Sequence, residues 1–207
     1  MLGAENQSRQ PVACAHSRRQ TLAGAFLATV AGAPWWKPPP ADALPLAPLG
    51  GVERVGGSKL TGLTVEQVKD ILARDLSAGQ YFVTGNLTRE VFADDCQFKD
   101  PTNDVTGLSR YTKALGLLFD PEYSVVRLRS ISVAGPRTIE ADYVSGGYLK
   151  FPWHPRVEPY EGHIIYTLNE EGLVQVQEQT WSKPAFEALR ESFTPTSGPR
   201  GDIKHLE

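Results

Sequence analysis

The sequence predicts an α+β domain in which a helical first half is followed by an antiparallel half. Apolar residues recur at helical spacing in the first half. Four runs of strand type follow, separated by turns, at residues 123–133, 138–151, 160–169 and 173–181. Helices that precede a block of strands are typical of the α+β class. A length of 207 residues with 41% hydrophobic content allows one such domain and an extension.

The extension lies at the N-terminus, residues 1–43, and has the features of a targeting leader. The sequence SRRQTL at 17–22 is a twin-arginine motif, and an uncharged apolar run follows over Leu22–Ala33. These 12 residues are fewer than the roughly 20 that a helix needs to cross a bilayer. Ala41–Ala43 form an A-x-A signal-peptidase site. We therefore expect a cleaved twin-arginine signal that directs the chain to the thylakoid lumen or, alternatively, to a bacterial periplasm.

Removal of the leader makes the chain more acidic. The full chain has 21 basic and 24 acidic residues, and 17 basic and 22 acidic residues remain after position 43. Because nucleic-acid binding depends on basic patches, this balance argues against a nucleic-acid partner. Cys96 is the only cysteine after the leader, which excludes an intramolecular disulfide and a cysteine-based metal site there. We expect its thiol to be buried and unreactive.

The chain after the leader divides into three segments by composition. Residues 44–60 are rich in Pro and Gly without periodicity and are predicted to be a linker. Residues 61–194 carry the periodic segments and form the predicted domain. Residues 195–207 are polar and are predicted to be a tail.

Three helices are expected before the sheet. Thr64 and Gln67 form a capping box, which predicts a helix that runs to about Phe82. A short helix over 88–93 precedes an acidic strand and a Pro-ended turn. Thr106 is then expected to cap an amphipathic helix, whose apolar stripe consists of Leu108, Tyr111, Leu115 and Leu118.

Two interruptions of the strands predict a bent sheet. The alternation changes phase at Ser130, and Gly146–Gly147 interrupt a strand that would otherwise be long and flat, so we expect a β-bulge at each place. Three prolines within Phe151–Glu161 predict a loop at the rim instead of a central strand. Ser182 is expected to cap a last helix whose apolar residues face the core, namely Phe186, Leu189 and Phe193.

A motif in the middle of the chain carries a family resemblance. F-x-x-D-x-x-F-x-D-P lies at Phe92–Pro101, and G-L-x-x-Y follows at Gly107–Tyr111. With the element order, the motif resembles the nuclear transport factor 2-like and SnoaL-like superfamily, and more narrowly its uncharacterised plant and algal organellar branch. The resemblance extends over roughly Leu63 to Phe193. It implies a cone in which a curved antiparallel β-sheet wraps around N-terminal helices, and it favours the thylakoid lumen.

The resemblance implies no single activity, because the superfamily holds isomerases, dehydratases, hydrolases, transport adaptors and non-catalytic binding modules. An acid/base enzyme in such a cone needs a carboxylate as base and a neutral donor to the oxyanion. Glu178 alternates with Val174 and Val176 and is the candidate base if that face is interior. His163 could lie across from Glu178, or in solvent if its strand has the opposite phase. Tyr143 is the candidate donor.

Five further residues are candidates for ligand binding. Tyr111 and Tyr166 are expected to point toward the concave side, and Trp153 lies in the rim loop. Asp95 and Asp100 belong to the shared motif, with an alternative structural role as acceptors at a helix end and in a turn. No dense cluster of metal ligands, phosphate-binding Gly-rich loop or nucleophile elbow is present, so the sequence implies no metal or cofactor.

Three functions of different classes follow from these features. The first is a non-catalytic lumenal protein that binds a small apolar ligand or assists the assembly of a photosynthetic complex. The alternatives are a cofactor-free acid/base enzyme and a structural module that forms a homodimer through the sheet. One face of the last strand is either a partner surface or an ordinary solvated face; it carries Gln175, Gln177, Gln179 and Trp181.

Overall fold

The computed structural model describes residues 57–200. The predicted leader, nearly all of the predicted linker and the last seven residues lie outside the described residues. The elements follow in the order α1 (Val65–Ser77), α2 (Tyr81–Thr84), the 3-10 helix η1 (Arg89–Val91), β1 (Phe92–Asp100), β2 (Asn103–Thr106), α3 (Leu108–Leu118), β3 (Val125–Gly135), β4 (Thr138–Tyr148), β5 (Arg156–Leu168), β6 (Val174–Trp181) and α4 (Ala185–Phe193).

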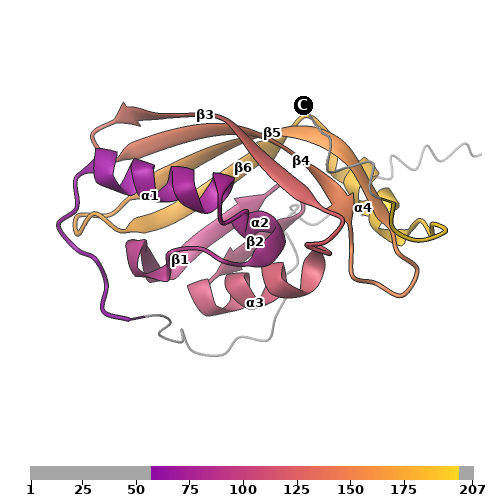
Figure 1. Cartoon of the computed structure of the whole chain (residues 1–207). Coiled ribbons are helices and arrows are strands. Elements are labelled where there is room, and N and C mark those ends of the chain that lie inside the picture. Colours follow the sequence, from indigo (N-terminus) through magenta and orange to yellow (C-terminus); the bar gives the residue numbers. More distant parts are fainter. Residues whose placement is uncertain (1–56, 201–207) are drawn as a thin grey trace, which may run out of the picture. The chain divides into compact units, whose positions relative to one another are not determined.

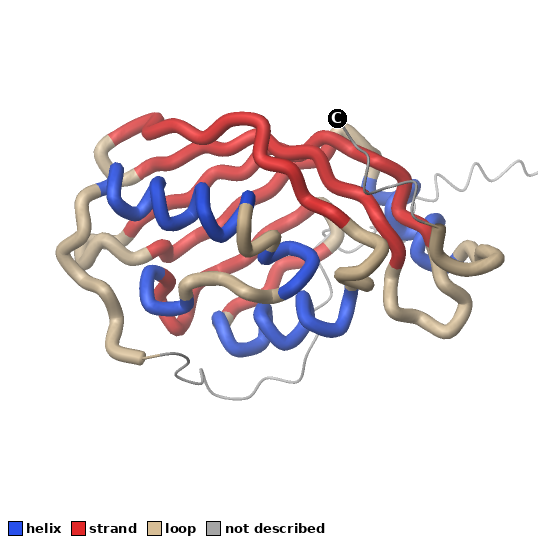
Figure 2. Tube along the Cα trace, viewed as in Figure 1, coloured by secondary structure: helices blue, strands red, loops and turns tan. Residues whose placement is uncertain are grey.

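The strands form one six-stranded sheet in the order β2-β1-β6-β5-β4-β3. The sheet curves around α1, α2 and α3, which cover its concave face (Figures 1 and 2). This arrangement confirms the predicted α+β cone. The expectation of a purely antiparallel sheet is wrong in one place, because β1 pairs with β6 in parallel. The chain reaches β6 from β1 through α3 and four other strands, so no hairpin constrains the direction of that pair.

Helix α1 begins as predicted but ends earlier. The Thr64 hydroxyl accepts from the Gln67 amide, and the Gln67 side chain accepts from the Thr64 amide, which completes the capping box. The helix ends at Ser77 instead of Phe82, since Gln80 has the left-handed φ of 48°. A Cβ atom added at Gly79 would lie only 2.8 Å from the Asp75 carbonyl oxygen, so this position favours glycine. The chain therefore breaks at this point and resumes as the separate short helix α2.

The segment before α3 contains a strand that the sequence pattern missed. β2 pairs antiparallel with β1 directly after the Asp100 turn. Thr106 is the last residue of β2, and Gly107, with a φ of 108°, occupies the N-cap of α3 without a side-chain cap. The predicted Thr106 cap is therefore wrong. The predicted helix over 88–93 shortens to the single 3-10 turn η1.

Both predicted bulges are confirmed, and they bend the sheet. The register between β3 and β4 shifts between Leu128 and Ser130, and that between β4 and β5 shifts between Ser145 and Gly147. The predicted rim loop is shorter than expected, because β5 already begins at Arg156. Pro159 is tolerated in β5 since β6 ends opposite Gly162, which leaves the start of β5 as a free edge.

The core lies between the helices and the concave face of the sheet. Helix α1 contributes Val68, Leu72 and Leu76, each with no exposed surface. Their spacing of four residues places them on one face, and full burial of each stabilises the fold by about 1.5–3 kcal/mol. The largest fully buried side chains of this core are aromatic: Tyr81, Phe92, Tyr143 and Tyr166.

Helix α4 has the opposite orientation to the predicted one. Its apolar residues point to solvent, with exposed fractions of 78% for Phe186, 52% for Leu189 and 68% for Phe193. Glu191 is the buried residue of this helix. The prediction that the apolar face packs on the core is therefore wrong, and so is the Ser182 cap, because Pro184 precedes the helix without a side-chain cap.

Candidate functional site

The phase of β6 decides which side chains enter the cone. Val174 pairs with Leu168, but Val176 pairs with Thr167, so the register slips by one residue at Gln175. After this irregularity Gln177 faces the interior with no exposed surface, and Glu178 is exposed. The prediction that Glu178 shares the interior face with Val174 and Val176 is wrong, because the irregularity reverses the alternation.

A chain of neutral polar groups crosses the interior. The Tyr81 hydroxyl donates to Gln177 Oε1 at 3.0 Å and lies 2.8 Å from the Tyr166 hydroxyl. Gln177 Nε2 donates to the Tyr111 hydroxyl at 3.0 Å. Both ends of the buried amide are therefore paired, as buried polar groups require. Tyr111 and Tyr166 occupy the predicted concave side, and a role in ligand binding stays a prediction for both.

Tyr81 and Gln177 were not among the predicted site residues. Gln177 belongs to the glutamine-rich face of β6, which the sequence pattern left open between a partner surface and a solvated face. The signal that could have located it is Trp181, since an aromatic residue four positions along a strand shares its face. From Gln177 onward that face proves to be interior, because Gln177 is fully buried, whereas Gln175 precedes the slip and contacts the exposed Asp95.

Tyr143 forms a second polar contact closer to the end of the sheet. Its hydroxyl donates to Gln179 Oε1 at 2.8 Å, and its ring passes over Gly162 of the neighbouring strand. Tyr160 and Trp181 lie beside it, with ring centroids 5.6 Å apart. The Trp181 indole N–H is buried and has no hydrogen-bond partner among residues 57–200. The predicted donor Tyr143 is thus interior, but no predicted base accompanies it.

Burial keeps the interior hydroxyls neutral. Loss of hydration raises the pKa well above its ordinary value for Tyr81, Tyr111 and Tyr143, and it raises the pKa of Tyr160 to about 12. Desolvation is the largest cause in each case. At neutral pH these groups can donate hydrogen bonds but cannot act as bases.

We expect this burial to make the fold sensitive to alkali. Each folded-state pKa lies above the unfolded value of about 10, so the neutral hydroxyls stabilise the fold fully below that pH. This contribution is lost as the pH rises through the folded values. An alkaline titration followed by both tyrosinate absorbance and circular dichroism should show most ionisation together with unfolding. If most tyrosinate forms near pH 10 in a folded protein, the assignment of these side chains to the interior is wrong.

The predicted His163 lies on the outer face of the sheet. His163 Nδ1 is 2.8 Å from Asp142 Oδ1, and the Ser130 hydroxyl donates to Asp142 Oδ2 at 2.7 Å. The bond to His163, followed by that to Ser130, lowers the pKa of Asp142. Both residues line a shallow hollow of about 540 Å³ at the surface. The structure therefore pairs His163 with Asp142, and the predicted pair with Glu178 is not formed.

The acids of the shared motif have local structural partners. Asp100 Oδ1 accepts from the Thr102 amide and the Thr102 hydroxyl, both at 2.7 Å, which fixes the turn between β1 and β2. Asp95 is exposed and accepts from Gln175 Nε2 at 3.1 Å. The Asp100 contacts agree with its structural alternative, whereas Asp95 bonds to a side chain of β6 instead of to a helix end.

Trp153, the predicted ligand-binding residue of the rim loop, anchors that loop to α4. Its indole N–H donates to the Ser192 carbonyl at 2.9 Å, and its ring stacks on Phe151 at 4.9 Å. Cys96 is buried, and burial raises the pKa of its thiol. Within residues 57–200, no group of three or more His, Cys, Asp or Glu side chains is arranged to bind a metal ion. Over the same range, no helix combines the length and apolar character needed to span a bilayer.

The fold and the interior geometry define a cone-shaped α+β domain. Residues 66–176, just over half of the chain, match the family described as uncharacterized conserved protein (DUF2358), and the chain belongs to this family. A search of curated proteins finds no match.

Solved structures with the same type of fold are similar to this chain at low identity. An NTF2-like protein from Burkholderia thailandensis is 12% identical, covers 61% of this chain and 97% of its own, and has a TM-score of 0.46. A hypothetical protein with a ketosteroid isomerase-like fold from Catenulispora acidiphila, in complex with trimethylamine, is 17% identical, with coverages of 64% and 96% and a TM-score of 0.43. SalBIII, an epoxide hydrolase/cyclase-like enzyme of pyran ring formation in salinomycin, is 15% identical, with coverages of 58% and 95% and a TM-score of 0.44. At these low identities and TM-scores, the similarity assigns no activity to this chain.

Proposed function

We propose that the chain is a non-catalytic protein of the thylakoid lumen that assists the assembly of a photosynthetic complex by binding a partner at its surface. The observation that carries this proposal is the interior chain of Tyr81, Tyr166, Gln177 and Tyr111. These groups satisfy one another and are neutral, and the candidate base Glu178 is exposed on the other side of the sheet. Proton abstraction inside a cone requires a free base there. The buried carboxyl of α1, Asp75, already accepts from the amide and the hydroxyl of Thr88. A binding module has no such requirement.

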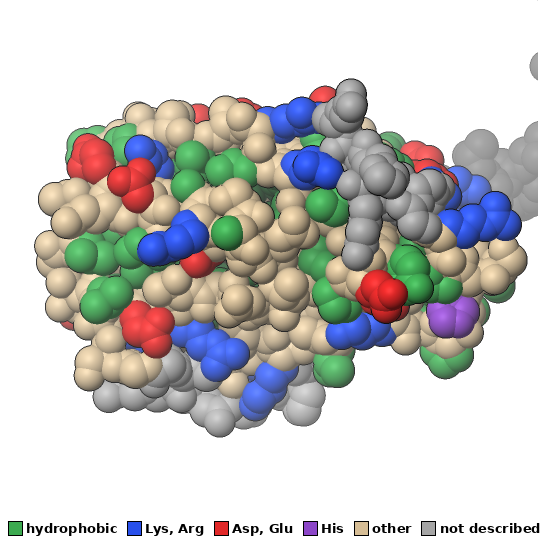
Figure 3. Space-filling model, viewed as in Figure 1, with side chains coloured by type: hydrophobic (Ala, Val, Ile, Leu, Met, Phe, Trp, Pro, Cys, Tyr) green, Lys and Arg blue, Asp and Glu red, His purple; other side chains and the backbone are tan. Residues whose placement is uncertain are grey.

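A small apolar ligand in the cone has less support than a surface partner. The concave face is filled by large side chains, of which Tyr81, Tyr143 and Tyr166 are at most 1% exposed. A ligand that entered among them would have to displace hydrogen-bonded hydroxyls, which costs free energy unless the ligand replaces the bonds. Outside the cone, charged side chains of both signs alternate with apolar ones on the face that Figure 3 shows.

The proposal can be tested in a photosynthetic host that lacks the protein, by measuring assembled complexes on native gels. Wild type and the double variant Glu178→Gln/His163→Gln should restore assembly equally, because both substitutions lie on the outer face and remove only acid/base groups. Arg18→Lys with Arg19→Lys serves as the location control. This variant should accumulate as a precursor and fail to restore assembly. A double variant that accumulates normally and still binds the complex, but fails to restore assembly, would contradict the non-catalytic function.

An acid/base enzyme that uses the outer-face hollow is the second candidate, favoured by the pair of Asp142 and His163. The Asp142 carboxylate can only accept, so Nδ1 of His163 carries the hydrogen of this bond. In a neutral His163, Nε2 then carries the lone pair that could accept a proton. Thr180, Glu161, Ser182 and Arg129 are among the other residues that line the hollow. In the same host, loss of assembly in the single variant His163→Gln, with Glu178→Gln unaffected, would favour this candidate.

A further inference from the structure

We propose that the α4 apolar face, formed by Phe186, Leu189 and Phe193, is a two-fold interface between two copies of this chain. The three residues recur at i, i+3 and i+7 and therefore lie on one side of the helix. All three are more than half exposed, whereas an amphipathic helix at the edge of a domain normally buries such a face.

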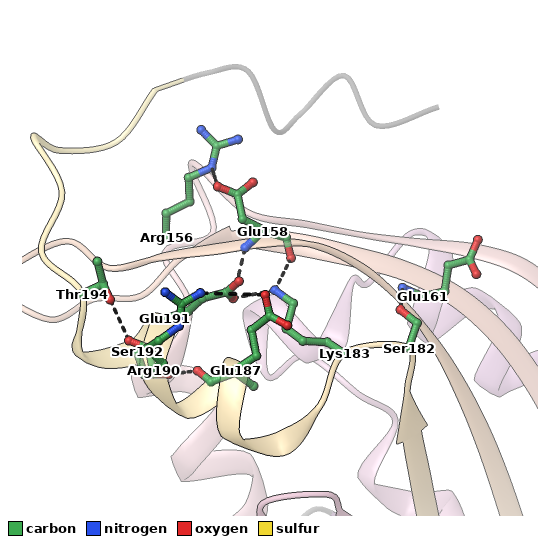
Figure 4. A network of polar contacts seen from close by, with 11 residues as sticks. Arg156, Glu158, Glu161, Ser182, Lys183, Glu187, Arg190, Glu191, Ser192 and Thr194 are labelled. Carbon is green, nitrogen blue, oxygen red and sulfur yellow. Dashed lines mark hydrogen bonds and ion pairs between the residues drawn. The ribbon is translucent and has the colours of Figure 1, made fainter.

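A buried ion pair holds α4 with its polar face inward. Lys183 and Glu191 side chains are 8% and 10% exposed, and their charged atoms are 2.5 Å apart. Lys183 Nζ also donates to the Glu158 carbonyl at 2.9 Å, and the Glu158 amide donates to Glu191 Oε2 at 3.3 Å. Figure 4 shows this network between α4 and β5. With the bond from Trp153 to Ser192, it fixes the outward direction of the apolar face before any partner binds. Such preorganisation lowers the cost of association.

The exposed apolar area of the α4 apolar face is comparable to the apolar area that each copy buries in a standard dimer interface. An aromatic side chain buries about 150–250 Å², so the exposed parts of Phe186 and Phe193 offer roughly 220–370 Å². Leu189 lies between them and adds to this area. A standard interface buries about 800 Å² on each partner, of which a little over half is apolar. The α4 apolar face would thus supply most of the apolar core, and neighbouring polar residues would supply the rim.

The charges beside the face suit a second copy. Glu187 and Arg190 are exposed on the same flank and lie 3.9 Å apart. In an antiparallel pair of α4 helices, the same flank of each helix meets the other, so Glu187 of one copy can approach Arg190 of its partner. A two-fold interface needs this self-complementarity. The outer face of the sheet is less suited to pairing, because a dimer there would have to bury Asp142 and Glu178.

Sedimentation velocity of the full chain over a range of concentrations tests the proposal. We expect wild type to dimerise and Leu189→Glu to remain monomeric at every concentration, with unchanged circular dichroism because Leu189 is 52% exposed. Leu60→Glu is the matched control, since this leucine is 43% exposed at a site away from α4, and it should still dimerise. Glu187→Arg should weaken the dimer a few-fold, and addition of Arg190→Glu should restore it.

Two results would overturn the proposal. One is a wild-type chain that stays monomeric throughout, including a monomer that floats with vesicles of anionic lipid, which would assign the α4 apolar face to a membrane surface. The other is a wild-type dimer that Leu189→Glu leaves intact, which would place the interface elsewhere in the chain. A folded, monomeric Phe186→Glu variant would give independent support for the assignment.

Discussion

Replacement of Gly147 by alanine is expected to lower the free energy of unfolding by about 3 kcal/mol or more, at the upper end of the usual range for overpacking. The added Cβ would lie 2.6 Å from the Cα and 2.2 Å from the Cβ of Ser124. Ser124 cannot move aside easily, because its hydroxyl donates to the Tyr148 carbonyl and accepts from the Tyr148 amide. The clash therefore involves the backbone of Ser124 as well as its side chain, next to the bulge at Gly147.

Chemical denaturation followed by circular dichroism measures this effect, and Gly116→Ala is the control. An added Cβ at Gly116 meets no atom within 4 Å. Because Gly116 lies within α3, alanine should stabilise the domain there by up to about 1 kcal/mol. If Gly147→Ala unfolded at the same denaturant concentration as wild type, the close approach of Ser124 to the bulge would be wrong.

Removal of one partner of the buried ion pair is the second change with a large expected effect. Lys183→Met leaves the Glu191 carboxylate buried without its cation, which typically costs about 3–5 kcal/mol. We expect a lower unfolding midpoint and faster amide hydrogen exchange over 185–193, since release of α4 is the simplest way to hydrate Glu191. Lys183→Met with Glu191→Leu should recover most of the loss, because an apolar pair of similar size needs no counter-charge.

Lys150→Met is the matched control for this prediction. Lys150 is exposed and donates to the Gly116 carbonyl, so its loss should cost little. Amide exchange in α4 that is the same in Lys183→Met and Lys150→Met would show that the ion pair does not hold the helix. The experiment also bears on the proposed dimer, since the α4 apolar face keeps its direction only while Glu191 stays anchored.

The sequence by itself determined the features that depend on neighbouring residues. The capping box at Thr64 and Gln67 needs only one helical turn, and it begins α1 as predicted. The phase change at Ser130 and the glycines at 146–147 mark bulges because they interrupt a local alternation, and both are present. The α+β class follows from the order of such local patterns.

Tertiary structure decided which faces of these elements are inside. The slip at Gln175 follows from the pairing of β6 with β5, and it exchanges Gln177 for Glu178 at the interior. Likewise, the parallel pairing of β1 with β6 joins segments that are about 80 positions apart. Helix α4 has one apolar and one polar face, and its own sequence does not show that Lys183 and the backbone of Glu158 provide a buried partner for Glu191. A periodic pattern defines two faces, but only the contacts that distant segments provide determine which of the two is buried.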